Sequence, residues 1–98
     1  MAAHNKVFAI HPGDILRTEF MEPLGITAYR LAKELHVSAP RINDLVRGKR
    51  SITADTAIRL GKFFGTSPQM WLNLQNDYDL RLAGSRGHKE VKPLHRAA

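Results

Sequence analysis

The segment from Ser38 to Arg50, SAPRINDLVRGKR, contains side chains that can recognise the edges of nucleic-acid bases. Arginine can donate two hydrogen bonds to guanine, asparagine can pair with adenine, and aspartate can accept a hydrogen bond from cytosine. These contacts are made in the major groove of DNA, which is wide enough to admit a helix. The segment therefore predicts base recognition, provided that it is a helix with these side chains on its outer face.

Helical geometry predicts which residues of this segment would face outward. If Ile42, Leu45 and Val46 face the core, a rotation of 100° per residue places the opposite side of the helix in solvent. The residues on that side or on its flanks, which we predict to contact bases, are Pro40, Arg41, Asn43, Asp44 and Arg47. Solvation alone also predicts a polar outer face on an amphipathic helix, so the side chains by themselves leave both interpretations open.

Basic and hydroxyl side chains flank this helix where a DNA backbone would run. Two of them follow it directly, and others open the preceding helix or cap this one. The predicted phosphate contacts are Thr27, Tyr29, Arg30, Ser38, Lys49 and Arg50. Residues 27–62 carry eight Lys and Arg against three Asp and Glu, an excess of +5 in a chain whose net charge is +6. This distribution favours a polyanionic partner.

Two short helices separated by a tight turn would position these residues. Thr27 is a suitable N-cap for a helix over 28–35, and Ser38 is a suitable N-cap for a helix that ends at about 47–48. A helix-turn-helix also needs a small residue in its first helix, an apolar residue in the turn and apolar residues under its second helix. The residues that meet these needs are Ala32, Val37, Ile42 and Leu45.

The apolar spacing in the rest of the chain also fits helices rather than strands. Three further helices are predicted: one that begins after Pro12 and Gly13 and ends at Pro23 and Gly25, one between Thr53 and Gly65, and one over 68–83. Gly61 lies inside the second of these and would allow a neighbouring helix to approach closely. No period-two alternation of useful length appears, so the predicted fold is all-α with five helices.

The length of 98 residues suits one domain with short extensions. We expect a loose lead-in over 1–11, one helical domain over 12–83, and a basic flexible tail over 84–98, where the composition shifts to Gly, Ser, His and Lys. The tail carries four Lys and Arg against one Glu.

The composition argues against several kinds of chemistry. There is no cysteine, which removes disulfides, thiolate catalysis and cysteine-rich metal sites. The five histidines lack the spacing of metal ligands, so we expect them to be solvated: His4, His11, His36, His88 and His95. Gly48 and Lys49 lack the surroundings of a phosphate loop. We therefore expect no enzyme activity, no metal and no small-molecule cofactor.

No run of about eighteen apolar residues occurs, and the N-terminal stretch carries only scattered apolar side chains. The expectation is a cytoplasmic protein without a membrane span or signal peptide.

The last predicted helix has apolar residues on more than one side, as in a helix that packs within the core or at a subunit interface. The residues predicted to contribute to a homodimer interface are Trp71, Leu74, Tyr78 and Leu82. For Trp71 taken alone, a position in the core is favoured. A two-fold dimer would place two recognition helices one helical turn apart, about 34 Å, on an inverted repeat.

Several stretches of the sequence resemble the HigA antitoxins, also described as virulence-associated protein I, within the Xre and Cro/CI repressor superfamily. They are HPGDILRTEFMEPLGIT (11–27), YRLAKEL (29–35), VS and RIN around the turn, GKRSITADTAIRL (48–60) and KFFGTSPQMWLNLQNDYDL (62–80). The resemblance implies a lambda-repressor-like DNA-binding domain that dimerises, binds double-stranded operator DNA to repress its own operon, and neutralises a HigB-type mRNA endonuclease toxin.

The resemblance also implies that base contacts begin at Ala39 and Pro40, where this sequence departs from the family's more usual proline followed by a polar residue. His36 stands at a turn position often held by glycine, and Gly61 stands where alanine is common.

Three functions remain open from the sequence. The first is a DNA-binding antitoxin and autorepressor, which the match in the last helix supports. The second is an orphan repressor of the same fold without a toxin. The third is a protein-interaction module whose helix-turn-helix is only structural.

Overall fold

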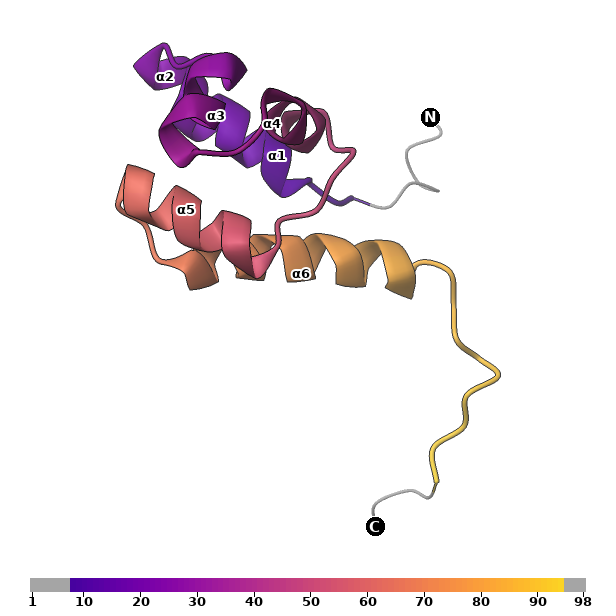
Figure 1. The fold of residues 1–98 in the computed structure, drawn as a ribbon. Coiled ribbons are helices and arrows are strands. Elements are labelled where there is room, and N and C mark those ends of the chain that lie inside the picture. Colours follow the sequence, from indigo (N-terminus) through magenta and orange to yellow (C-terminus); the bar gives the residue numbers. More distant parts are fainter. Residues whose placement is uncertain (1–7, 95–98) are drawn as a thin grey trace, which may run out of the picture.

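The computed structural model describes residues 8–94, and every regular element in that range is a helix. The first helix consists of three consecutive segments: α1 (Pro12–Ile15), the π-helical η2 (Leu16–Met21) and α2 (Glu22–Leu24). Four helices follow: α3 (Ala28–Leu35), α4 (Ala39–Val46), α5 (Ala54–Phe64) and α6 (Pro68–Gly84). Figure 1 shows the other helices gathered on one side of α6. The predicted all-α fold with five helices is confirmed.

Side-chain caps explain where the last four helices begin. Each helix is preceded by a Ser or Thr whose hydroxyl accepts a hydrogen bond from the backbone N–H three residues later, at 3.1 to 3.3 Å. The caps are Thr27, Ser38, Thr53 and Ser67. Each cap satisfies one backbone donor at a helix start, which contributes about 1 kcal/mol to stability. The predicted starts of these helices are confirmed.

The first helix contains its π-helical segment just before Pro23. The Glu22 N–H donates to the carbonyl of Arg17, five residues back instead of the usual four. Proline has no N–H, and its ring crowds the carbonyl four residues earlier in an α-helix, so a wider turn accommodates it. Pro23 therefore lies inside the last turn, and the helix ends at Leu24, just before Gly25.

The core is formed by side chains from every helix of the described range. Its buried members are Leu16, Met21, Ile26, Leu31, Ala32, Leu35, Ile42, Leu45, Ile52, Ala57, Leu60 and Trp71. Trp71 has no exposed surface, and its Nε1–H donates to Thr66 Oγ1 at 2.8 Å. The core position of Trp71 is confirmed. Its assignment to a dimer interface is wrong, because no part of the side chain is left to contact a second subunit.

Two glycines allow backbones to come into contact. A Cβ atom at Gly13 would overlap the carbonyl oxygen of Leu45, where the first helix meets the end of α4. A Cβ atom at Gly61 would lie 2.6 Å from the carbonyl oxygen of Thr66. The close approach expected at Gly61 is therefore present, and its neighbours are the turn before α6 and Pro68, the first residue of that helix.

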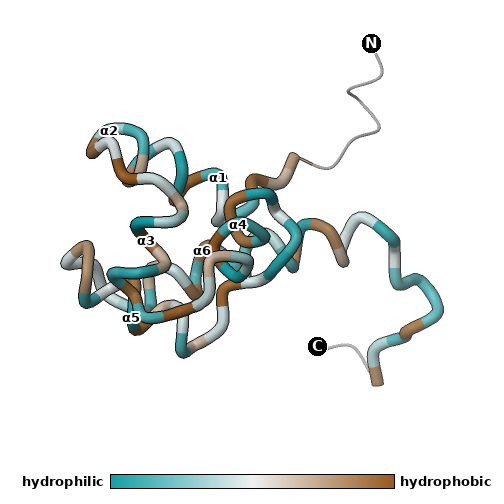
Figure 2. The backbone as a smooth tube through the Cα atoms, turned by 45° about the horizontal axis from the view of Figure 1, so that its top comes forward, coloured by the Kyte–Doolittle hydropathy of each residue, from teal (hydrophilic) through white to brown (hydrophobic). Residues whose placement is uncertain are grey.

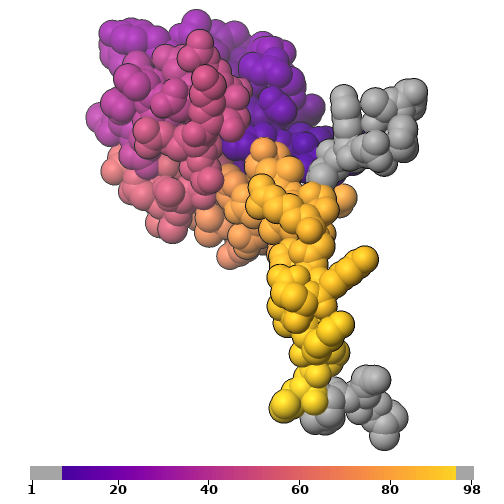
Figure 3. Space-filling model, turned by 90° about the vertical axis from the view of Figure 1, so that its right-hand side faces the viewer, coloured from indigo at the N-terminus to yellow at the C-terminus, as the bar shows by residue number. Residues whose placement is uncertain are grey.

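Beyond α6, residues 85–94 extend away from the helical body as an exposed arm (Figure 1, Figure 3). Figure 2 shows this arm as mostly hydrophilic, with short hydrophobic stretches. Val91 and Leu94 are large apolar side chains that are exposed in it. The flexibility expected of the tail stays a prediction. Residues 1–7 and 95–98, with His4, His95 and Arg96, lie outside the described residues. None of the helices described is both long and apolar enough to span a membrane.

His11 joins the start of the first helix to α6. Its imidazole is 7% exposed, and its Nδ1 accepts a hydrogen bond from the Gly13 N–H at 2.8 Å to cap the first helix. Its ring packs edge-on against Tyr78 of α6, with ring centroids 4.8 Å apart. The expectation of a solvated histidine is wrong for His11, because its ring is buried between the start of the first helix and α6. The loose lead-in therefore ends before His11.

Because His11 is buried, we expect the free energy of unfolding to decrease in weak acid. Burial lowers the pKa of His11 below 6.5, although the charges of Asp14 and Asp79 and a hydrogen bond with the Arg50 backbone act in the opposite direction. The unfolded chain therefore binds a proton at a pH where the folded chain does not. The neutral form of His11 therefore contributes to the free energy of unfolding. This contribution is fully present above pH 6.5 and is lost as the pH falls from 6.5 through the lowered pKa of the folded state. Denaturant titrations on both sides of 6.5 would measure it, with a slope of at most about 1.4 kcal/mol per pH unit for one proton.

The matched variant is His11→Asn, since asparagine can still cap a helix but does not titrate. Its free energy of unfolding should be lower than that of the parent chain at neutral pH, because the ring contact is lost, and should vary less with pH. Equal pH dependence in the two proteins would assign the effect to other groups.

The turn after α3 requires a left-handed backbone at His36. Its φ is 59° and its ψ is 46°, and the N–H of Val37 donates to the carbonyl of Ala32 at 3.0 Å. This is the Schellman arrangement that ends many helices, usually with glycine at the left-handed position. A side chain with a Cβ is strained there. His36 is the one residue other than glycine with a positive φ among residues 8–94.

The variant His36→Gly should therefore be more stable than the parent chain by about 1 kcal/mol, which raises the melting temperature by roughly 4–8 °C in a domain of this size. His36→Ala is the control, because it removes the imidazole but keeps the Cβ atom. Thermal unfolding of the three proteins would decide the matter, and a gain of the same size in both variants would attribute it to the lost ring and not to the backbone.

Candidate nucleic-acid interface

The helix-turn-helix predicted from the sequence is present. Helices α3 and α4 pack against each other, and the small side chain of Ala32 is only 2% exposed where they meet. Val37 is partly buried in the turn. Ile42 and Leu45 are buried beneath α4, at 0% and 1% exposure. The four residues therefore have the structural roles that the sequence predicted.

The predicted base-contacting residues differ in how they are presented. Pro40, Asn43 and Arg47 are exposed, whereas the other three are partly buried: Ala39, Arg41 and Asp44. The carboxylate of Asp44 lies 4.0 Å from the guanidinium of Arg50, and the two side chains are 41% and 49% exposed. An exposed pair of this kind is worth at most about 1 kcal/mol, so either group can exchange its partner at small cost.

Arg41 differs from the other five because its guanidinium is bound within the chain. Its Nη2 donates to Asp55 Oδ2 at 2.8 Å and to Thr56 Oγ1 at 2.6 Å, in the first turn of α5. Hydrogen bonds from Arg41 and Arg59 lower the pKa of the Asp55 carboxyl, so the group is ionised at neutral pH. These two hydrogen bonds hold the Nη2 end of Arg41 against α5 and oppose its movement toward a base.

The predicted phosphate-contacting residues lie at the starts of α3 and α4 and in the loop after α4. The hydroxyls of Thr27 and Ser38 already accept backbone N–H groups as caps. The Tyr29 ring is 66% exposed and lies beside the ammonium group of Lys33, 5.8 Å from the ring centroid. The Arg30 guanidinium is 3.6 Å from the Glu34 carboxylate, on an exposed face. Lys49 and Arg50 are exposed.

The loop after α4 is held in place by Gln75, which sequence reasoning missed. This side chain is 4% exposed, and its Oε1 accepts a hydrogen bond from the Ile52 N–H at 2.7 Å. Its Nε2 donates to Asp79 Oδ1 at 2.9 Å. A glutamine in a helix gives no sign of a partner 23 residues away, so no local pattern could have identified this contact.

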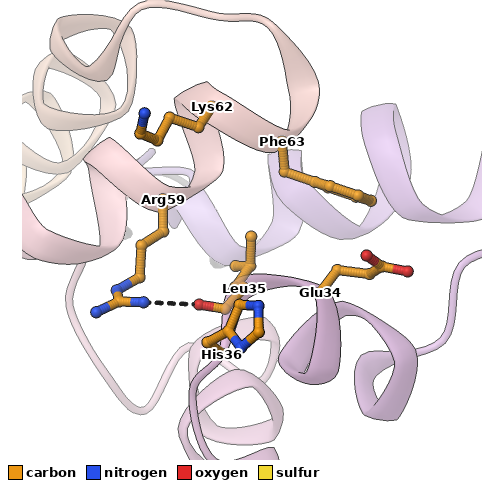
Figure 4. Close-up of a pocket in the computed structure, with 6 residues that line it drawn as sticks. All are labelled: Glu34, Leu35, His36, Arg59, Lys62 and Phe63. Atoms are coloured by element: carbon orange, nitrogen blue, oxygen red, sulfur yellow. Dashed lines mark hydrogen bonds between the residues drawn. The ribbon is translucent and has the colours of Figure 1, made fainter.

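Asp55, Thr56 and Arg59 were also missed. They form one network with Arg41, and a pocket of about 240 Å³ lies beside it, between the end of α3 and α5. The pocket is lined by Glu34, Leu35, His36, Arg59, Lys62 and Phe63 (Figure 4). Among the described residues, no three His, Asp or Glu side chains gather closely enough to hold a metal ion.

Known proteins with related sequences match most of the chain. A helix-turn-helix family model matches residues 19–71. Virulence-associated protein I of Dichelobacter nodosus is 56% identical over 82 residues, which cover 84% of this chain and 76% of that protein. Antitoxin HigA-1 of Vibrio cholerae is 39% identical over 85 residues, which cover 84% of this chain and 80% of that protein.

A solved structure agrees with the fold as well as the sequence. The Pseudomonas aeruginosa antitoxin HigA, solved with the higBA promoter, is 50% identical and has a TM-score of 0.82; the match covers 88% of this chain and 98% of that one. Together with the capped helix-turn-helix described above, these matches show that the chain belongs to the helix-turn-helix family, among the HigA-type antitoxins and virulence-associated protein I.

Proposed function

We propose that this chain is a sequence-specific DNA-binding antitoxin that represses its own operon and neutralises a HigB-type mRNA endonuclease toxin. The observation that carries the proposal is the outer face of α4, which presents Asn43 and Arg47 to solvent and is followed directly by Lys49 and Arg50. The fold match to a HigA antitoxin solved with promoter DNA supports it. The role is binding and not catalysis, and its place is the cytoplasm, where bacterial operators lie.

In this proposal α4 enters the major groove of the operator. Asn43, Asp44 and Arg47 contact base edges, since their side chains offer the donors and acceptors that bases match. Ala39 and Pro40, at the start of the helix, pack against the bases. The groups that contact phosphates are Thr27, Tyr29, Arg30, Ser38, Lys49 and Arg50, which fix the position of the chain along the groove.

A homodimer is part of the same proposal. One chain presents one recognition helix, and a single half-site supplies too few contacts for tight specific binding. Leu74, Tyr78 and Leu82 follow one another at intervals of four residues on α6 and keep part of their surface exposed. These side chains are candidates for a two-fold interface, which would place the two recognition helices about 34 Å apart.

Binding to the chain's own promoter is the direct test of the function. Affinity should fall steeply as salt rises, because Lys and Arg displace counterions from phosphates. Copurification of a second protein expressed from the intact operon would support the toxin-binding part of the proposal. Operator binding without such a partner would indicate an orphan repressor, and no promoter binding even at low salt would overturn the DNA-binding role.

Substitutions on α4 should separate base contacts from phosphate contacts. Asn43→Ala and Arg47→Ala should each reduce the preference for operator over random DNA by about 1–3 kcal/mol, because each loses a base partner. Lys49→Ala should instead weaken binding to both DNAs alike. The slope of log affinity against log salt should become shallower by about 0.9, the value for one phosphate contact. Fluorescence anisotropy with both duplexes would measure this, and an equal loss on both duplexes in Asn43→Ala would remove it from the base-contacting set.

The dimer predicts a concentration-dependent mass. Leu82→Glu introduces a charge into the proposed interface and should shift the chain toward monomer, so that it loses more affinity for a full operator than for a half-site control. Sedimentation at micromolar concentrations, with and without operator, would measure it. Glu substitution of Val91 in the exposed arm is the control, and a parent chain that stays monomeric on operator would contradict the dimer.

A further inference from the structure

The Asp55 carboxylate joins two arginines from different helices at one oxygen. Its Oδ2 accepts from Arg41 Nη2 at 2.8 Å and from Arg59 Nε at 3.0 Å. Arg41 belongs to α4, while Asp55 and Arg59 belong to α5. Thr56 adds a second acceptor for Arg41 at 2.6 Å, and its hydroxyl is in turn 3.2 Å from that of Thr53. The first turns of α4 and α5 are thus connected through charged hydrogen bonds.

The same network reaches α3. Arg59 Nη1 donates to the carbonyl of Leu35 at 2.8 Å, as the dashed line in Figure 4 shows. Leu35 is the last residue of α3, where helix carbonyls lack partners within the helix. Arg59 therefore binds the end of α3 with one part of its guanidinium and Asp55 with another. Helix α4 is thus attached to α5 through Arg41 and Asp55, and α3 is attached to α5 through Arg59, which also binds Asp55.

Arg41 occupies a position from which a free guanidinium would interact with DNA. It lies in the first turn of α4, the helix that presents Asn43 and Arg47 outward, and its side chain is 24% exposed. A cation there is not favoured by the helix dipole, which is positive at the N-terminus. Its attraction to phosphate would be the same for every DNA sequence. Asp55 supplies a competing anion within the chain.

We propose that Asp55 is a positioning residue for DNA specificity: it keeps Arg41 away from the DNA backbone and fixes α4 relative to α3 and α5. The inference rests on the proposed DNA binding. It gives Arg41 a structural role in place of the base contact expected from the sequence. Specific binding then depends on a residue of α5 that contacts no base.

Loss of the carboxylate should have two measurable effects. In Asp55→Ala, the released Arg41 gains a phosphate contact, so the slope of log affinity against log salt should become steeper by about 0.9 on any DNA. The less firmly oriented α4 should reduce the ratio of operator to random DNA affinity about tenfold, within the range lost when a single good base contact is removed. Random DNA should therefore bind more tightly than it does to the parent chain at low salt.

The experiment compares the parent chain, Asp55→Ala, Arg41→Ala and the double variant by salt titration on operator and random duplexes. If Arg41 makes the new contact, the double variant should return to the salt slope of Arg41→Ala alone. A steeper slope that persists without Arg41 would show that only the lost negative charge matters, and would overturn the proposal. Glu34→Ala, which removes a charge from an exposed pair with Arg30, should leave the slope unchanged.

Melting temperatures of all variants would show that each is folded. We expect Asp55→Ala to fold because the Asp55 side chain is 55% exposed. If Asp55→Ala keeps both the operator preference and the salt slope of the parent chain, the inference fails and the proposed function stands. If the parent chain itself does not prefer operator DNA, the proposed function fails and the inference falls with it.

Discussion

Ile42 and Leu45 are almost completely buried beneath α4, and this burial decides which side of the helix faces outward. A helix of eight residues forms less than three turns and is not stable alone in water. Its structure depends on the side chains under it, each of which would cost about 2–5 kcal/mol if it were cut back to alanine. The polar outer face of α4 is therefore a consequence of the apolar inner face.

The contacts at the ends of α4 serve the same purpose. At its C-terminal end, Gly13 lets the first helix approach the Leu45 carbonyl, and Gln75 binds the following loop through the Ile52 N–H. At its N-terminal end, Ser38 caps the helix and Arg41 binds α5. Elements from both ends of the chain thus hold eight residues in one orientation, as rigid presentation of a short helix requires.

Local signals were sufficient for most of the fold. Thr27, Ser38 and Thr53 predicted helix starts because a hydroxyl cap acts within three residues, and Ile42 predicted the inner face of α4 because helical rotation is regular. The contacts that could not be predicted join residues far apart in sequence. Gln75 reaches Ile52 across 23 positions, and nothing in its neighbours indicates that partner.

Two errors have the same origin. A histidine near a terminus is usually solvated, so the sequence favours a loose lead-in at His11, but α6 returns to cover this residue with Tyr78. The apolar residues on several sides of α6 leave both a core and an interface position open for Trp71. Only the packing of Phe20 and Thr66 around it shows which side is internal. The candidate site followed from the sequence as a set of residues, but the availability of each side chain did not.

The acidic residues of the basic segment show how availability is set. Residues 27–62 hold three acids, and each lies beside an arginine: Glu34 beside Arg30 at 3.6 Å, Asp44 beside Arg50 at 4.0 Å, and Asp55 beside Arg41 at 2.8 Å. The first two pairs are long and exposed, so a phosphate can replace the carboxylate at little cost. The third is short, is supported by a hydroxyl, and involves a side chain only 24% exposed. The arginines of this segment therefore differ in how readily they can bind a phosphate. The excess of +5 overstates the number of cations that are available to a DNA backbone.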